Sequence, residues 1–238
     1  MNTILDQDRA GISQEITREF FKNVYAYMFA ALLVSGFVAF LAGNPEFYAK
    51  YFFNSEGTSV GMLFYVVAFA PIGLVYFIQK SINKYSFGTL LILFILFSAL
   101  MGLSLSSVML MYSGRDIAIT FFVSAGAFGG MALLGYTTKT DLTKMGSLLY
   151  MAFIGIFIAS IANFFLGSSM LQFAISVIGV FVFTGLTAYS MQQLKRTAAD
   201  TTISVDQRSK LALMGGLNLY ILFVNLFLSL LNLIGGRN

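Results

Sequence analysis

The chain has 238 residues, of which 58% are hydrophobic and only 10% are charged, and its net charge is +4. An average soluble domain is about 45–50% apolar and about 25% charged, and a soluble fold of this length leaves much of its surface in water. The composition therefore argues against a soluble enzyme, a nucleic-acid-binding module and a disordered chain, and it predicts an integral membrane protein in a lipid bilayer.

Cysteine and histidine are both absent from the sequence. The chain can form no disulfide, offers no thiol nucleophile and lacks the ligands of the usual zinc site, and histidine cannot serve as its pH sensor. We therefore expect no cofactor and no bound metal. Cationic loops on the cytoplasmic side of a membrane explain the surplus of positive charge better than a nucleic-acid partner does.

Seven apolar stretches lie between the charged residues, and each reaches the length of about 20 residues that a spanning helix needs. They predict an all-α, polytopic fold with helices over residues 21–43, 57–79, 86–112, 117–137, 145–167, 170–193 and 211–234. The turn signal Gly167-Ser168-Ser169 divides a run that is too long for one span. On this interpretation residues 1–20 form a polar cytoplasmic segment, the first helix is uncleaved, and residues 21–236 form a single transmembrane domain.

Lysine and arginine are distributed unevenly between the two ends of the predicted helices. The N-terminal segment and the second, fourth and sixth connections hold eleven of them, whereas the other side holds Lys50, Arg115 and Arg237. Because cytoplasmic loops are enriched in these residues, the N-terminus is predicted to be cytoplasmic and the C-terminus external. The sixth connection, residues 195–210, is expected to be a solvated surface loop.

The seventh predicted helix carries Asn218, Asn225, Ser229 and Asn232 at helical spacing on one face. Amide side chains are poorly suited to lipid, so this face should point into the protein, and the helix is expected at the centre of the other six. Two roles stay open for these side chains. They either form hydrogen bonds between helices, with Asn225 buried, or line a pathway for an ion or solute.

Pro71 interrupts the second predicted helix. It cannot donate a hydrogen bond to the carbonyl of Val67, and its ring crowds that turn, so a kink is expected. A neighbouring helix must then satisfy the freed carbonyl. The kink is interpreted either as a static bend or as a gating hinge. Small residues at four-residue spacing, among them Gly126 and Gly130, predict packing seams between helices.

All ten acidic residues lie in predicted loops or at predicted helix ends. Proton pumps and cation-coupled transporters usually place an aspartate or glutamate at membrane depth. The sequence also lacks a phosphate-binding glycine-rich loop, carboxylates paired in register and a nucleophile beside a base. We therefore expect no catalytic residues and no enzymatic activity.

Three segments of the sequence resemble the Bax inhibitor-1 family, and its bacterial branch in particular. They are LNLYILFVNLFLSLL at 217–231, TAY at 187–189 with QLK at 193–195, and GYTTKTDL at 135–142. The resemblance implies seven helices, the last enclosed by the other six, in a bacterial inner membrane. It also implies a cation leak, chiefly for calcium and controlled by pH. Some bacterial members are instead linked to a membrane-bound protease.

The sequence departs from this family at the proposed proton-sensitive latch, because Ser190 and Leu222 stand where the family typically carries two aspartates. If the alignment holds, these two side chains face each other. The candidate pore or polar-network residues are Tyr189, Ser190, Gln193, Asn218, Leu222, Asn225 and Ser229. Two functions stay open. One is a calcium or other cation leak channel without the latch, and the other is a non-conducting regulator that binds a membrane protease or another membrane protein.

Overall fold

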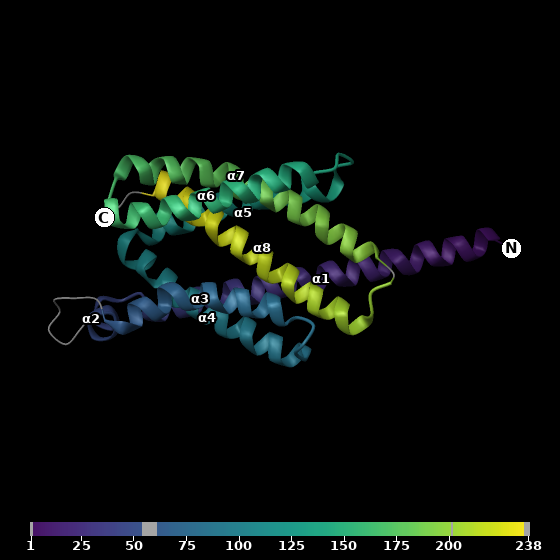
Figure 1. Cartoon of the computed structure of the whole chain (residues 1–238), viewed down its shortest axis with the longest axis horizontal. Coiled ribbons are helices and arrows are strands. Elements are labelled where there is room, and N and C mark those ends of the chain that lie inside the picture. The colour runs from purple at the N-terminus through teal and green to yellow at the C-terminus, as the bar shows by residue number, and fades with distance from the viewer. Residues whose placement is uncertain (1, 54–60, 201, 236–238) are drawn as a thin grey trace. The chain divides into compact units, whose positions relative to one another are not determined.

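The computed structural model describes residues 2–53, 61–200 and 202–235, with side chains from residue 14 onward. Within these ranges the chain forms eight α-helices and no strand (Figure 1). They are α1 (Asn2–Ala42), α2 (Pro45–Tyr51), α3 (Met62–Ser81), α4 (Phe87–Met111), α5 (Gly114–Thr137), α6 (Thr143–Leu166), α7 (Ser169–Ala199) and α8 (Val205–Ile234). All but α2 are long and apolar enough to cross a membrane, which confirms the seven predicted spans.

Three boundaries differ from the prediction. Helix α1 begins at Asn2, so most of the predicted N-terminal segment continues directly into the first span. Helix α7 extends to Ala199 and α8 begins at Val205, which shortens the expected loop of residues 195–210 to residues 200–204. The predicted start of the second span, at residue 57, lies outside the described residues, and α3 begins at Met62.

The short helix α2 was not predicted, because it is far too short to span a membrane. Its N-terminus is nevertheless encoded locally. The Asn44 side chain accepts a 2.8 Å hydrogen bond from the Phe47 backbone N–H, and Pro45 occupies the first helical position. Asparagine is a favoured N-cap residue, and proline at the first position loses no helical hydrogen bond.

The helices group into two compact units. The α3–α4 unit contains α1 from Lys22 onward, α2, α3, α4 and the part of α8 up to Leu217. The α5–α7 unit contains the start of α1, helices α5, α6 and α7, and α8 from Asn218 onward.

Close backbone approaches hold the α3–α4 unit together. A Cβ atom at Gly102 of α4 would lie 2.6 Å from the Ser35 carbonyl oxygen of α1, and one at Gly216 of α8 would lie 2.8 Å from the Val24 carbonyl oxygen. The Ser104 hydroxyl of α4 donates a 2.9 Å hydrogen bond to the Val67 carbonyl of α3. Small residues at these positions let helices pack without bulky side chains between them.

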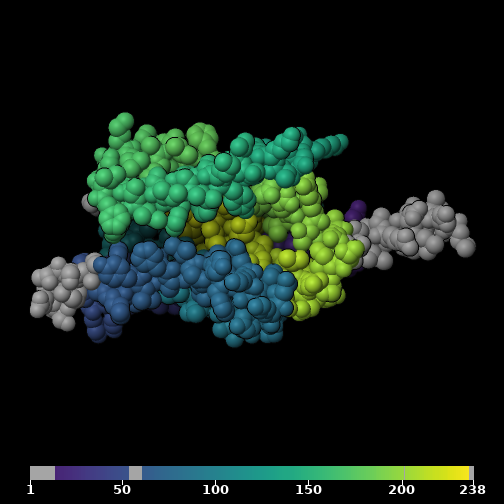
Figure 2. Space-filling model, in the orientation of Figure 1, coloured from purple at the N-terminus to yellow at the C-terminus, as the bar shows by residue number. Residues whose placement is uncertain are grey.

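In the α5–α7 unit, α7 packs against both α5 and α6. Helix α6 forms part of the outer surface, in the green range of Figure 2, and it is the least buried of the seven spans. Helix α8 is the most buried span, and Leu219, Tyr220 and Leu226 are fully shielded from solvent. This burial confirms the prediction that the last helix is enclosed by other helices.

Candidate functional site

Helices α7 and α8 meet along an antiparallel interface that carries three of the predicted site residues, Ser190, Asn218 and Ser229. The Asn218 Nδ2 atom of α8 donates a 3.0 Å hydrogen bond to the Ser190 hydroxyl of α7. Three turns away, a Cβ atom at Gly179 of α7 would lie 2.6 Å from the Ser229 hydroxyl of α8. The two contacts are eleven residues apart on both helices. The helices therefore run antiparallel and keep the same register between these contacts.

Three consecutive residues of α7 each contact a different helix. A Cβ atom on Gly135 of α5 would overlap the carbonyl of Ala188. The ring of Tyr189 covers Gly146 of α6, where a Cβ atom would lie 2.5 Å from the ring. Ser190 binds Asn218 of α8 as described above. Because successive residues of a helix point about 100° apart, this short segment of α7, residues 188–190, is the point at which four helices converge; we call it the hub.

Aromatic packing supports the hub on its α6 side. The rings of Tyr150 in α6 and Tyr189 in α7 lie edge to face, with centroids 6.0 Å apart at an interplanar angle of 86°. Edge-to-face pairs of this kind are favourable because the ring edge and ring face carry opposite partial charges. The Tyr150 hydroxyl also interacts with the Ser190 side chain. Ser190 is therefore shared between α6 and α8, and it is almost fully buried.

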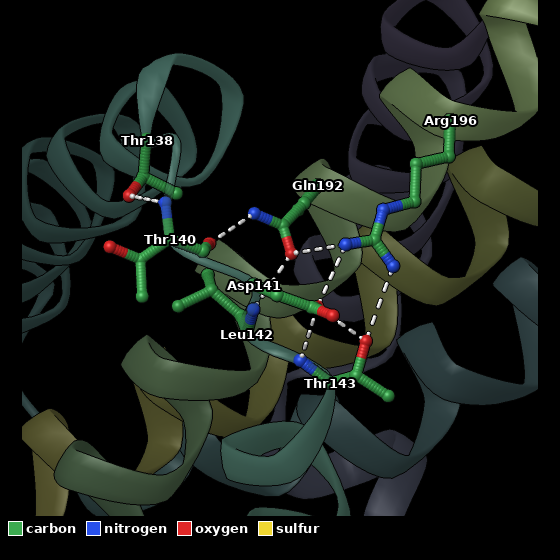
Figure 3. Close-up of polar contacts among 7 residues, drawn as sticks. All are labelled: Thr138, Thr140, Asp141, Leu142, Thr143, Gln192 and Arg196. Atoms are coloured by element: carbon green, nitrogen blue, oxygen red, sulfur yellow. Dashed lines mark hydrogen bonds and ion pairs between the residues drawn. The ribbon is translucent and has the colours of Figure 1, made fainter.

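Two residues after the hub on α7, Gln192 attaches this helix to the connection between α5 and α6 (Figure 3). We call this connection, residues 138–142, the strap. The Gln192 Nε2 atom donates a 2.8 Å hydrogen bond to the Thr140 carbonyl, and its Oε1 atom accepts a 2.9 Å hydrogen bond from the Leu142 backbone N–H. Gln192 is only 6% exposed, so the hydrogen bond to Leu142 is shielded from competing water and the one to Thr140 is partly shielded.

Charged side chains complete this attachment at the surface. Arg196 pairs with Asp141 of the strap at 2.7 Å and donates a 3.3 Å hydrogen bond to the Gln192 amide oxygen. Hydrogen bonds from the Thr143 hydroxyl and from Arg196 lower the pKa of Asp141 from 3.8 to about 2. Lys195 donates a 2.7 Å hydrogen bond to the Tyr136 carbonyl. Asp141 is therefore ionised throughout the physiological pH range.

The structure brings together only some of the residues predicted from the sequence. Tyr189, Ser190, Asn218 and Ser229 all lie at the contacts just described. Leu222 is buried, one turn along α8 from Asn218, and its direct contact with Ser190 stays a prediction. Pro71 belongs to the α3–α4 unit, and its role as a bend or hinge stays a prediction.

The prediction that Asn225 is buried and hydrogen-bonded to another helix was wrong for the residues that the structure describes, and its role in a pathway stays a prediction. Its side chain is half-buried, and its Nδ2 atom donates a 2.8 Å hydrogen bond to the Ile221 carbonyl of its own helix. An asparagine can satisfy itself in this way without any partner on a second helix. Gln193 is also half-buried, and within the described part of the chain it is the neighbouring Gln192 that makes the contacts between segments.

Sequence reasoning missed Gln192, Arg196 and Asp141. A helical pattern was available, because Ala188, Gln192 and Arg196 follow one another at four-residue spacing and share one face of α7. Ala188 contacts α5 and the other two bind the strap. What the sequence could not supply was the position of the strap, which only the packing of α5 and α6 on α7 determines.

The chemistry of the site is that of a neutral polar interface beside an exposed ion pair. Ser190, Asn218 and Ser229 offer hydroxyl and amide groups but no charge. Among the residues that the structure describes, no group of three or more acidic side chains could hold a metal ion. The described side chains of the hub can therefore position helices through hydrogen bonds between uncharged groups.

The match to known proteins covers nearly the whole chain. A family model described as "Inhibitor of apoptosis-promoting Bax1" matches residues 17–238. The chain belongs to the Bax inhibitor-1 family. Inner membrane protein YbhL of Escherichia coli (strain K12) is 41% identical over 232 residues, which cover 97% of this chain and 95% of YbhL.

Two further bacterial relatives show the same extended similarity. A protein of Borreliella burgdorferi is 42% identical, with 93% of this chain and 94% of the relative covered. A membrane protein of Streptococcus pyogenes serotype M1 is 32% identical, with 98% and 97% covered. The hub and the strap thus belong to a Bax inhibitor-1 family membrane protein that is similar to these bacterial relatives over nearly all of the aligned sequences.

Proposed function

We propose that this Bax inhibitor-1 family protein is a cation leak pathway in a bacterial inner membrane, permeable to calcium and free of the family's pH latch. The observation that carries the proposal is the hydrogen bond between Ser190 and Asn218, two uncharged polar groups at the α7–α8 interface. Polar groups inside a membrane are costly and commonly mark a solute pathway. Ser229 extends the polar line three turns along α8. On this proposal the protein moves ions and catalyses no covalent reaction.

The residues along this interface imply weak ion selectivity. Calcium prefers several oxygen ligands, and carboxylates bind it most tightly. Ser190 and Leu222 occupy the two positions at which the family typically has aspartates, and neither can carry a negative charge. Asn218 and Ser229 are neutral as well. We therefore expect low affinity for calcium and measurable passage of monovalent cations through the same pathway.

The proposed orientation places the N-terminus in the cytoplasm, from the distribution of eleven basic residues against three. The strap and Arg196 then lie on the cytoplasmic side, and the C-terminus lies outside. Reporter fusions at residue 10 and after Asn238 test this orientation. Activity of the two reporters on opposite sides of the membrane is expected, and activity on the same side would contradict it.

Calcium flux into liposomes that contain the purified protein tests the leak directly. We expect flux above that of empty liposomes at both acidic and neutral pH. A comparison variant is Gly179→Leu: a Cβ atom there would already lie 2.6 Å from the Ser229 hydroxyl, so the larger side chain must disturb the interface and should change the flux. Flux equal to that of empty liposomes at both pH values, from a protein that unfolds cooperatively, would contradict the proposal.

The second candidate function is a non-conducting regulator that binds a membrane protease or another membrane protein. The observation that favours it is the close packing of Gly179 on Ser229, which leaves no room for a side-chain atom between these two residues. The absence of aspartate at positions 190 and 222 also fits a protein that has lost conduction. The liposome experiment separates the two functions, because the regulator predicts no flux under any condition.

A further inference from the structure

The Gln192 side chain forms hydrogen bonds with two backbone groups of the strap that have no partner within a helix. Thr140 and Leu142 lie outside the helices, so the carbonyl of one and the N–H of the other need partners elsewhere. A single buried glutamine supplies both, at 2.8 and 2.9 Å. Removal of its amide would leave the buried Leu142 N–H and the part-buried Thr140 carbonyl without this partner, and such a loss favours any state in which water reaches them.

The outer part of the attachment is weaker than the inner part. Asp141 and Arg196 have side chains that are 66% and 49% exposed, and exposed ion pairs contribute little because water and salt screen them. Arg196 also donates to the Gln192 oxygen at 3.3 Å, so it helps to orient the amide. The strap is therefore held chiefly by Gln192, and the ion pair between Asp141 and Arg196 contributes less.

The strap is connected directly to two of the hub contacts. Gly135, which accommodates Ala188, lies three residues before residue 138, and Gly146, which lies under the Tyr189 ring, comes four residues after residue 142. Both glycine contacts are too close to admit a side chain. A strap that moves away from α7 must therefore loosen the contacts of Ala188 and Tyr189, and Ser190 follows them directly in the same turn.

We propose that the strap is a closing device for the hub: while Gln192 holds it, α7 is fixed against α5 and α6, and its release loosens residues 188–190 and raises cation flux. This inference rests on the proposed leak function for its effect on flux. Its structural part, the control of hub packing by Gln192, stands on the contacts alone (Figure 3).

Cysteine labelling measures strap release independently of transport. The chain has no native cysteine, and Leu142 of the strap is 8% exposed, so Leu142→Cys gives a single buried reporter. The second change is Gln192→Met, which keeps the length of the side chain and removes its amide. Its matched control is Gln193→Met, at the half-buried neighbour on the same helix. Labelling by a membrane-impermeant maleimide and calcium flux are measured on the same preparations.

We expect Gln192→Met to raise the labelling rate by about tenfold, because the loss of one buried and one part-buried hydrogen bond should raise the population of the open strap by about that factor. Gln193→Met should leave the rate within about twofold of the parent, and Arg196→Gln should raise it by about two- to threefold. Gln192→Glu keeps the acceptor for Leu142 and loses the donor to Thr140, so an intermediate rate is expected. This conservative variant keeps the test available if Gln192→Met does not fold.

Flux should rise in the same order as labelling. Equal labelling of the Gln192 and Gln193 variants would overturn the inference, and so would faster labelling with no change in a measurable flux. A parent protein without any flux would instead contradict the leak function. In that case the labelling rates alone decide whether Gln192 holds the strap.

Discussion

The Ser104 hydroxyl of α4 donates a hydrogen bond to the Val67 carbonyl of α3. This is the carbonyl that loses its helical donor because Pro71 lies four residues later. Proline has no N–H, so the residue four positions earlier loses its partner. In a membrane no water can replace that partner, and a side chain from a neighbouring helix must do so. The 2.9 Å contact thus ties α4 to α3 at the proline.

Ser104→Ala should lower the free energy of unfolding in detergent by about 0.6 kcal/mol and by no more than about 1.7 kcal/mol, the measured range for hydrogen bonds between membrane helices. Ser107→Ala is the control, because the Ser107 hydroxyl bonds the carbonyl of its own helix at Ser104. The serine effect should vanish in a Pro71→Ala background, where residue 71 regains its N–H. An undiminished effect in that background would separate Ser104 from the proline.

The fold was predictable from the sequence because long apolar segments have few alternatives in a membrane. The freed carbonyl of Val67 was predictable too, from the position of Pro71. Its partner Ser104 was not, since the sequence does not show which face of α4 meets α3. The same limit hid the strap, whose place beside Gln192 depends on how α5 and α6 pack.

The candidate site was predictable in part. The polar face of α8 correctly indicated a partner for Asn218, but the identical residue type at Asn225 satisfies itself on the Ile221 carbonyl. Helical spacing gives both asparagines the same face and cannot distinguish these outcomes. Between Gln192 and Gln193, adjacent residues of the same type, only tertiary packing decides which is buried.

Asn218→Ala should destabilise the protein more than Asn225→Ala. Asn218 links α8 to α7, and its loss removes a bond between helices worth about 0.6–1.7 kcal/mol. Among the described residues Asn225 bonds only within α8, so its replacement should change the melting temperature little. Thermal unfolding of both variants in the same detergent measures the difference. A larger loss for Asn225→Ala would contradict the contacts described for α8.

Two glycines of α5 should respond in opposite ways to alanine. At Gly135 a Cβ atom would overlap the Ala188 carbonyl, so Gly135→Ala should cost about 1–3 kcal/mol by overpacking. At Gly126 a Cβ atom meets no described atom within 4 Å, so Gly126→Ala should be neutral or stabilising by up to about 1 kcal/mol. Chemical denaturation of the two variants gives the comparison. Equal effects would show that α5 does not approach α7 at Gly135.

The contribution of the Asp141–Arg196 ion pair to stability should not change with pH under physiological conditions. The pKa of Asp141 is lowered from 3.8 to about 2, so its contribution to stability is fully present above the ordinary pKa. That contribution is lost only as the pH falls through about 2. The difference in melting temperature between parent and Asp141→Asn should therefore be constant between about pH 5 and pH 8. A difference that changes within that window would show that Asp141 titrates near neutrality.

Calcium flux against pH, for the parent protein and for the Ser190→Asp/Leu222→Asp double variant in liposomes, tests the central claim most directly. Neither serine nor leucine titrates, so parent flux should be measurable and nearly flat between about pH 6 and pH 8. Two carboxylates at close range raise one another's pKa, so the double variant should gain a response to mild acid. A strongly pH-dependent parent, or a well-folded double variant with no pH response, would contradict the account of a leak without its latch.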